Sequence, residues 1–361
     1  MFIEQISAEV ILFFILYGIT GVVPLIAALY LLLRRGNAIA PGITPPVRLR
    51  RWAAAFFAVA ALGHVWWYLF YIYSSDLQSA SYVVVGILDC VALLTTIAGT
   101  LLAMLQDRKR PIWPAFAAMA PFVALGVLQI LFPDTSFLVI ATIYILSIYV
   151  LFFVYMVFAV RQYGRWLNDN YADLENKKVW LSQTISLVCL LLFILYVIVA
   201  DMVLIYFLHI TELLLFCLLL WRVETLPQLP TQAQLQATVP ADIDLAQTER
   251  MLAEHCVDTQ LYLQHDLTLQ QLAQAIGTNR SYLSHYFSRQ SITYNTYINN
   301  LRINHFISRY QELASNKQSF SVQQLAKESG YRNYTTFSMA FKQRTGQNVR
   351  EWIRAANEKD V

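Results

Sequence analysis

Apolar residues in the first 221 positions of the chain form long runs instead of short alternating stretches. Each run reaches about 20 residues, the length at which a helix crosses the ~30 Å hydrocarbon core of a bilayer. Only Asp201 separates the last two runs, and we place a tight turn there because one helix over residues 180–221 would be about 60 Å long. The seven predicted spans are residues 8–33, 52–73, 82–105, 112–132, 136–160, 180–200 and 202–221.

Polar residues become frequent from Arg222 onward, and the pattern there is that of a soluble helical domain. Residues 222–241 contain three prolines and several glutamines, which is typical of a linker. A helix is predicted next, at about residues 242–256, from its stripe of apolar residues. We therefore expect an all-α protein with a transmembrane sensor domain over residues 1–221 and a second domain over residues 242–361.

The second domain contains one pattern twice. The two copies are LTLQQLAQAIGTNRSYLSHYF at residues 267–287 and SVQQLAKESGYRNYTTFSMAF at residues 321–341. In each copy a short helix is predicted to end at a glycine, because glycine readily adopts the left-handed conformation that ends a helix. The pattern predicts two helix-turn-helix units, at about residues 267–288 and 320–343.

The turn of each unit is marked by Gly277 or Gly330 and is followed by an asparagine, Asn279 or Asn333. Asparagine is a favoured N-cap residue, so a second helix is expected to begin there. The inner face of that helix is apolar, whereas its outer face carries short polar side chains suited to the major groove of DNA. The predicted inner-face residues are Leu283, Phe287, Phe337 and Phe341.

This domain resembles the DNA-binding domain of the AraC/XylS family of bacterial transcription regulators. The resemblance covers about residues 242–354 and includes YINNLRINHF at residues 297–306, between the two units, and FKQRTGQ at residues 341–347. It implies seven helices and two recognition helices that enter successive major grooves on one face of double-stranded DNA.

Carried over by position in the family's motif, the base-contacting residues would be Ser281, Ser284 and His285 in the first unit and Tyr334, Thr335, Ser338 and Met339 in the second. Many family members have arginine in place of His285 and Met339, and arginine pairs bidentately with guanine. The operator sequence therefore cannot be transferred from relatives. Asn348 and Val349 replace the family's usual Thr-Pro, so the resemblance does not fix where the last helix begins.

Charge is unevenly distributed in this half of the chain. Residues 224–266 carry a net charge of −6 and residues 267–356 a net charge of +8, although the whole chain carries only +3. A basic region of this kind suits phosphate contact, while a solvated helical face is the alternative interpretation of the bases alone. The predicted phosphate contacts, which would set affinity and salt dependence, are Arg289, Arg302, Lys342 and Arg344.

Lysine and arginine in the predicted loops separate cleanly by side of the membrane. The loops after spans one, three and five and the segment after span seven contain all of them, whereas the N-terminal segment and the other loops contain none. Because these residues accumulate on the cytoplasmic side, we expect a multi-pass protein of the bacterial inner membrane. Its N-terminus would lie outside and its DNA-binding domain in the cytoplasm.

Four ionisable residues lie inside the predicted spans: His64, Asp89, His209 and Glu212. Such residues are costly in lipid unless they are paired. At 1.5 Å per residue His64, Asp89 and His209 fall in the outer half of the membrane, with Glu212 one turn below His209 on the same face. We interpret them as a polar pocket for an unknown small-molecule or lipid signal. Hydrogen bonds that merely hold the helices together are the alternative. The ligand types would also suit a metal, but we assign no metal and no cofactor.

The predicted cytoplasmic loop at residues 161–179 is long for a connector. It is expected either to form an interfacial helix or to contact the DNA-binding domain and couple it to the sensor. The anchors of the interfacial helix would be Trp166, Leu167, Leu174 and Trp180.

The sequence as a whole favours a one-component transcription regulator embedded in a membrane. No nucleophile, zinc-helix or phosphate-loop motif is present, so no enzyme is predicted, and the absence of lysine from the spans excludes a retinal photosensor. A transporter or membrane enzyme with a regulatory DNA-binding tail, and spans that act only as a passive anchor, are the competing interpretations. The signal, the operator, the direction of regulation and the formation of a homodimer stay open.

Overall fold

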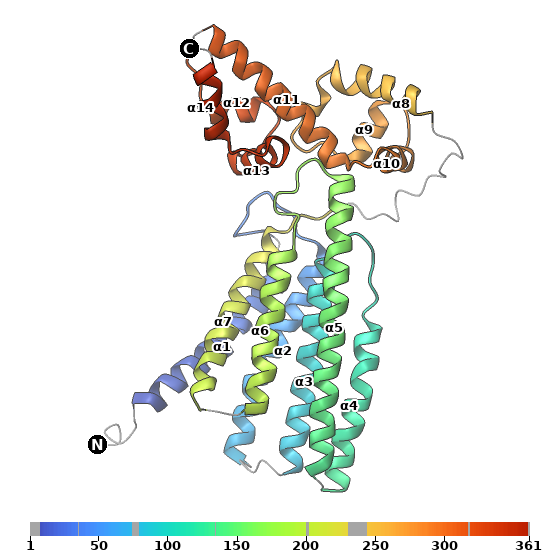
Figure 1. The fold of residues 1–361 in the computed structure, drawn as a ribbon. Coiled ribbons are helices and arrows are strands. Elements are labelled where there is room, and N and C mark those ends of the chain that lie inside the picture. Colours follow the sequence, from blue (N-terminus) through green and yellow to red (C-terminus); the bar gives the residue numbers. More distant parts are fainter. Residues whose placement is uncertain are drawn as a thin grey trace. The chain divides into compact units, whose positions relative to one another are not determined.

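The computed structural model describes residues 8–34, 36–73, 79–133, 135–199, 202–229, 244–316 and 318–359. Within these ranges the regular elements are helical, and fourteen α-helices are labelled in chain order (Figure 1). The predicted all-α fold is confirmed. The first seven helices are α1 (Ala8–Leu33), α2 (Val47–Tyr73), α3 (Ala80–Ala103), α4 (Trp113–Leu131), α5 (Thr135–Asn170), α6 (Trp180–Val199) and α7 (Met202–Thr225).

Six of the described helices, α1 to α5 and α7, are long and apolar enough to cross a membrane. The remaining predicted span corresponds to α6, whose described apolar stretch, Trp180–Leu192, is shorter. Helices α6 and α7 are separate elements, as the predicted turn between them requires, and Asp201 lies outside the described residues.

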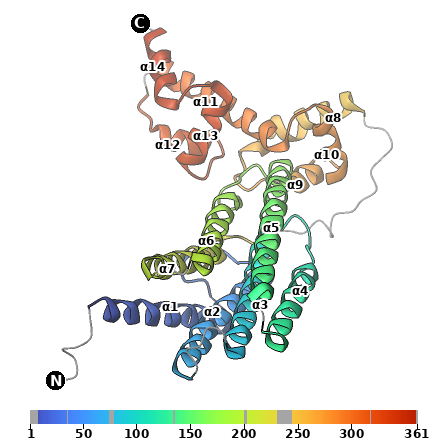
Figure 2. The same cartoon turned by 60° about the horizontal axis from the view of Figure 1, so that its bottom comes forward.

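Helix α2 packs against α1, α3 and α7 (Figure 2). Small residues allow this close approach, as they do in membrane helix pairs generally. At Gly99 of α3 the indole ring of Trp52 from α2 takes the space that a Cβ would need. The arrangement places α1, α2 and α7 side by side, and α2 and α7 carry three of the four ionisable residues of the predicted pocket.

Hydrogen bonds between helices supplement this packing. The Tyr149 hydroxyl of α5 donates to the Leu187 carbonyl of α6 at 2.7 Å, and Gln183 Nε2 of α6 donates to the Leu101 carbonyl of α3 at 2.8 Å. Both pairs are buried. Each side chain reaches a carbonyl on a neighbouring helix and so fixes the two helices relative to each other.

Helices α5 and α7 extend beyond the ends that the apolar pattern predicts. Helix α5 continues past the predicted end of its span at residue 160 to Asn170, and α7 continues to Thr225. The segment that follows α7 is also ordered, because Gln106 Nε2 donates to the Pro227 carbonyl at 3.0 Å and Gln106 Oε1 accepts from Leu229 N at 2.8 Å. The first part of the predicted linker is therefore held against the membrane helices, and residues 230–243 lie outside the described part of the chain.

The chain divides into two compact units. The first comprises Met1–Tyr163 with Val179–Pro230, and the second comprises Gly164–Lys178 with Thr231–Val361. The segment Gly164–Lys178 comprises the end of α5 and the connection to α6. The sequence predicts it as part of the membrane domain, but it packs with the second unit. The helices of the second unit are α8 (Leu245–Leu252), α9 (Leu269–Ala275), α10 (Arg280–Arg289), α11 (Tyr294–Ser315), α12 (Val322–Glu328), α13 (Tyr334–Thr345) and α14 (Val349–Lys359), in agreement with the seven that the resemblance implies.

Candidate functional sites

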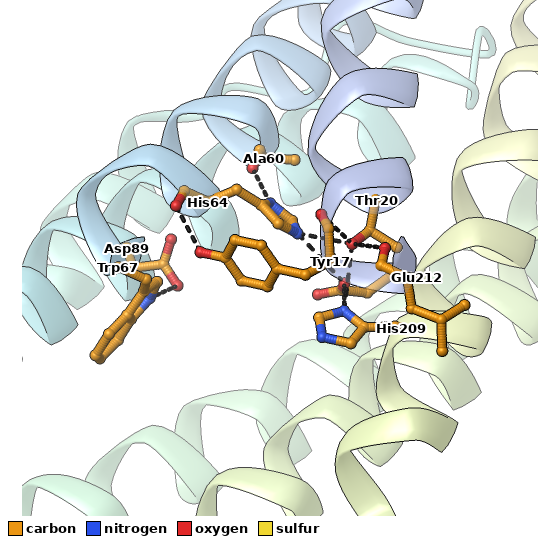
Figure 3. Close-up of polar contacts among 9 residues, drawn as sticks. Tyr17, Thr20, Ala60, His64, Trp67, Asp89, His209 and Glu212 are labelled. Carbon is orange, nitrogen blue, oxygen red and sulfur yellow. Dashed lines mark hydrogen bonds and ion pairs between the residues drawn. The ribbon is translucent and has the colours of Figure 1, made fainter. Parts of the chain in front are cut away.

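Three ionisable side chains from two membrane helices meet in the first unit (Figure 3). They are His64 of α2 and His209 and Glu212 of α7. Glu212 Oε2 lies 3.3 Å from His209 Nδ1 and 4.0 Å from His64 Nε2, and the three ligand atoms all lie within 4.8 Å of one another. The side chains are 14% exposed for His64, 6% for His209 and 20% for Glu212, so the cluster is nearly enclosed by protein yet reachable at its carboxylate.

Helix α1 contributes two further residues to this cluster that the sequence analysis did not single out. The Thr20 hydroxyl lies 2.9 Å from His64 Nε2 and 3.3 Å from His209 Nδ1. The Tyr17 hydroxyl donates to the backbone carbonyl of His64 at 2.6 Å. The two residues are three positions apart on one helix, so they share a face, and a polar pair of this kind in an apolar span is the signal that could have identified them.

The tautomer of His64 follows from its backbone contact. His64 Nδ1 lies 2.9 Å from the Ala60 carbonyl, and a carbonyl oxygen can only accept a hydrogen bond. Nδ1 therefore carries a proton, and Nε2 is the ring nitrogen that faces Thr20 and Glu212.

Asp89 of α3 lies apart from the other three residues of the predicted pocket. Its Oδ2 accepts from Trp67 Nε1 at 3.2 Å, and its Oδ1 packs against the bare backbone of Gly63. In Figure 3 the Tyr17 ring separates Asp89 and Trp67 from His209 and Glu212. The structure thus groups three of the four predicted residues and gives Asp89 an environment of its own.

The first helix-turn-helix of the second unit has the predicted turn. Gly277 adopts a φ of +74°, and the Asn279 side chain then caps α10 by accepting from Tyr282 N at 2.8 Å. Helix α9 is capped at its start, where Thr268 and Gln271 exchange hydrogen bonds as a capping box.

The second helix-turn-helix repeats this geometry. Gly330 adopts a φ of +88°, and Asn333 caps α13 by accepting from Thr336 N at 2.8 Å. The predicted inner faces are confirmed, since the side chains that hold each helix pair together are at most 2% exposed. Those residues are Leu272, Leu283 and Phe287 in the first helix-turn-helix and Leu325, Phe337 and Phe341 in the second helix-turn-helix.

Residues 272–355 match the family model described as a helix-turn-helix domain. This segment is an AraC-type DNA-binding domain. Neither a curated protein nor a solved structure matches the chain at a significant level. The protein therefore carries the DNA-binding domain of a regulator, joined to apolar helices that are able to span a membrane.

The predicted base-contacting residues of the AraC-type domain lie on α10 and α13, and none is buried. His285, Thr335 and Met339 are exposed, whereas Ser281, Ser284, Tyr334 and Ser338 are partly buried. Met339 is 61% exposed, which is unusual for methionine and is consistent with a place on a binding face. Arg289, Lys342 and Arg344 are exposed as phosphate contacts require.

Arg302 is the exception among the predicted phosphate contacts. It is 1% exposed and its guanidinium is directed inward, with Nε donating to the Tyr262 carbonyl at 2.7 Å and Nη2 donating to the Gln264 carbonyl at 2.6 Å. The guanidinium also lies 5.5 Å from the centroid of the Tyr331 ring. Burial lowers the pKa of Arg302. This arginine satisfies buried carbonyls of the domain core and is not available to a phosphate, so we withdraw it from the predicted set.

The segment Gly164–Lys178 contributes to the core of the AraC-type domain. Ala172 N donates to the Leu267 carbonyl at 3.3 Å, and Asn295 Nδ2 of α11 donates to the carbonyls of Tyr171 and Ala172 at 3.0 and 2.7 Å. Tyr171 is 8% and Ala172 is 3% exposed, and Ala172 packs within the apolar core of the first helix-turn-helix. The docking of this segment fits the second of the two predicted roles of the loop, contact with the DNA-binding domain.

One contact of this segment involves the first residue of a recognition helix. Arg280 Nε, at the start of α10, donates to Asn170 Oδ1 at 2.5 Å. Burial lowers the pKa of Arg280, and it raises the pKa of Tyr171 to about 12. Neither Arg280 nor Asn295 carries a recognisable sequence signal for this role, because their partners are more than a hundred residues away.

Proposed function

We propose that this protein is a one-component transcription regulator of the bacterial inner membrane that binds DNA through both helix-turn-helix units. Its membrane helices would respond to an outward or lipid-borne signal and alter the DNA-binding domain. The observation that carries this proposal is the packing of Gly164–Lys178 in the same compact unit as the helix-turn-helix motifs. Because this segment joins α5 to α6, a change at the ends of those helices acts directly on the domain.

The contacts of the docked segment give the signal a defined route. Asn170 contacts Arg280 at the start of α10, and the carbonyls of Tyr171 and Ala172 accept from Asn295 near the start of α11. Helix α11 runs between the two helix-turn-helix units. A signal that favours one position of the segment would therefore shift the population of DNA-binding states, provided that it binds those states with different affinity.

Binding by both units can be tested by genome-wide occupancy and footprinting of the full-length protein in its membrane at a stated salt concentration. One variant would combine Ser284→Ala with His285→Ala, and another would combine Thr335→Ala with Met339→Ala. Each specific base contact contributes about 1–3 kcal/mol, so each variant should lose occupancy and protection of one major-groove segment. Gln311→Ala, at an exposed position of α11, is the control and should keep the wild-type footprint.

The outcome of that experiment is decisive in either direction. A footprint that covers one groove segment in the wild-type protein, or that either variant leaves unchanged, would contradict binding by two units. An absence of specific sites would remove the regulator proposal and favour transport or catalysis by the membrane helices.

Coupling can be tested with Asn295→Ala, which removes the two hydrogen bonds that the Asn295 side chain donates to the docked segment. The matched control is Asn299→Ala, one turn further along α11, because Asn299 bonds to Asn295 and Tyr331 and not to the docked segment. We expect Asn295→Ala to keep specific operator occupancy but to lose the difference in transcription between signal-on and signal-off conditions. Asn299→Ala should retain that difference. Full regulation in Asn295→Ala would show that the membrane helices act only as an anchor.

A further inference from the structure

Two imidazole nitrogens and one carboxylate oxygen converge in the membrane unit. His64 Nδ1 donates to the Ala60 carbonyl, so Nε2 is the ring nitrogen that faces Thr20 and Glu212, and His209 Nδ1 also faces Glu212 and Thr20. These atoms are of the types that bind first-row metal ions, and they all lie within 4.8 Å of one another.

The distances favour a metal ion. In a tetrahedral zinc site the bonds to nitrogen and oxygen are about 2.0–2.2 Å, which places neighbouring ligand atoms about 3.3 Å apart. His209 Nδ1 and Glu212 Oε2 are separated by 3.3 Å, and His64 Nε2 lies 4.0 Å from the same oxygen. A small movement of the His64 ring would complete a three-ligand site with a fourth position toward Thr20.

The surroundings of His64 are those of a metal ligand. Metal-bound histidines usually donate the other ring N–H to a carbonyl or carboxylate, which fixes the tautomer and the orientation of the ring. His64 does so through Ala60, and the hydroxyl of Tyr17 in turn holds the backbone carbonyl of His64. The second ring nitrogen, Nε2, lies on the side of the ring that faces Glu212 and His209.

We infer that His64, His209 and Glu212 bind a first-row divalent cation, with zinc as the best fit, and that this ion is the signal that the membrane helices sense. Two imidazoles and one carboxylate suit zinc and its neighbours, whereas magnesium and calcium prefer oxygen ligands. The site holds α2 against α7. The sensing part of this inference rests on the proposed function, and the binding part does not.

Binding is tested on the full-length protein in lipid nanodiscs by zinc titration against a chelating dye. The ligand variants are His64→Gln, His209→Gln and Glu212→Gln, and the controls are Asp89→Asn and His255→Gln. We expect the wild-type protein and both controls to bind about one ion more than each ligand variant. Thr20→Val should bind about 10- to 100-fold more weakly, because its hydroxyl contacts both imidazoles. Equal zinc binding by wild type and all three ligand variants would overturn the site.

X-ray absorption on the zinc-loaded wild-type protein keeps the test independent of variant folding. Two imidazole ligands and an oxygen shell without sulfur are expected. A sulfur shell would assign the zinc to the cysteines and would overturn the site even if the variants failed to insert.

Sensing is then tested with an operator reporter in cells supplied with or depleted of zinc. Transcription should respond in the wild-type protein and in Asp89→Asn but not in Glu212→Gln. A zinc-loaded site without any transcriptional response would overturn the ion as the signal. The coupling proposal would still be decided separately by Asn295→Ala.

Discussion

Arg302 shows which residue-scale features can be predicted from sequence and which cannot. The caps at Asn279 and Asn333 are local, because the side chain bonds to a backbone N–H three residues later, and they were predictable. Arg302 instead donates to carbonyls 38 and 40 residues earlier in the chain. An arginine in a basic domain is ordinarily exposed, and only the tertiary contacts reveal that this one is part of the core.

Replacement of Arg302 should destabilise the AraC-type domain without changing its phosphate contacts. Arg302→Leu leaves the buried Tyr262 carbonyl without its donor and removes one of the donors to the Gln264 carbonyl, so the free energy of unfolding should fall by about 3 kcal/mol. Cys256 is fully buried in the core of the first helix-turn-helix, so its exposure to a thiol reagent reports the opening of the domain. Its rate of alkylation in the native protein should rise roughly 100-fold. Arg309→Leu is the control, because Arg309 is exposed, and it should leave the rate nearly unchanged.

The polar cluster of the membrane unit also combines a contact that the sequence predicts with one that depends on tertiary packing. His209 and Glu212 are three positions apart on α7, so their proximity follows from helix geometry. The approach of His64 depends on how α2 packs against α7, and that packing has no local signal. Asp89 is an ionisable residue of a predicted span, as the other three are. Its side chain nevertheless lies beside Trp67, because Gly63 leaves room for it there.

The turns of the two helix-turn-helix elements are equivalent in conformation but differ in surroundings. Both glycines have a positive φ, as their sequences predict. A Cβ at Gly277 would meet no atom within 4 Å, whereas a Cβ at Gly330 would lie 2.9 Å from both Arg302 Nε and the Leu263 carbonyl. The repeat in the sequence therefore hides a difference in packing.

Alanine at these two glycines should have unequal effects. Gly277→Ala incurs only the cost of the left-handed conformation, about 1 kcal/mol. Gly330→Ala adds a collision with backbone and with a fixed guanidinium, so a loss of about 3 kcal/mol is expected. Hydrogen exchange of α9–α10 and α12–α13 peptides in the full-length protein measures each unit separately. An equal loss of hydrogen-exchange protection, in α9–α10 of Gly277→Ala and in α12–α13 of Gly330→Ala, would contradict the predicted difference between the two glycines.

Helix α14 illustrates how one capping solution replaces another. Where the family usually has Thr-Pro, Asn348 Oδ1 accepts from Glu351 N at 2.9 Å and Glu351 Oε2 accepts from Asn348 N at 3.3 Å. This reciprocal pair is the geometry of a capping box. It sets the start of α14 at Val349, a boundary that the resemblance alone left open.

At the scale of the whole molecule, the sequence predicted the helices better than the division of the chain between units. Apolar runs mark membrane helices because the bilayer imposes their length. The same rule placed the Gly164–Lys178 segment in the membrane domain, although Tyr171 and Ala172 are buried among residues of the AraC-type domain. Composition identifies what surrounds a helix, but it does not identify the partner of a short polar segment.

The predicted membrane topology rests on the charge of the loops and can be measured directly. Alkaline phosphatase, which is active only outside the cytoplasm, would be fused after residues 79, 109 and 361. We expect activity after residue 79 only, because the adjacent predicted loop has no lysine or arginine whereas Arg108, Lys109 and Arg110 surround the second fusion point. Activity of the fusion after residue 361 would place the DNA-binding domain outside and contradict the predicted topology.

The docked Gly164–Lys178 segment gives the AraC-type domain two attachments, one through the chain after Leu229 and one through a segment that is part of its own core. A protease that cut once between Leu229 and Asp244 would leave the C-terminal fragment bound through Asn295, Tyr171 and Ala172. Release of a soluble regulator would require dissociation of that segment as well as cleavage. Under the proposed function, regulation by shedding is therefore disfavoured, and the genes that the protein controls would have to approach the membrane.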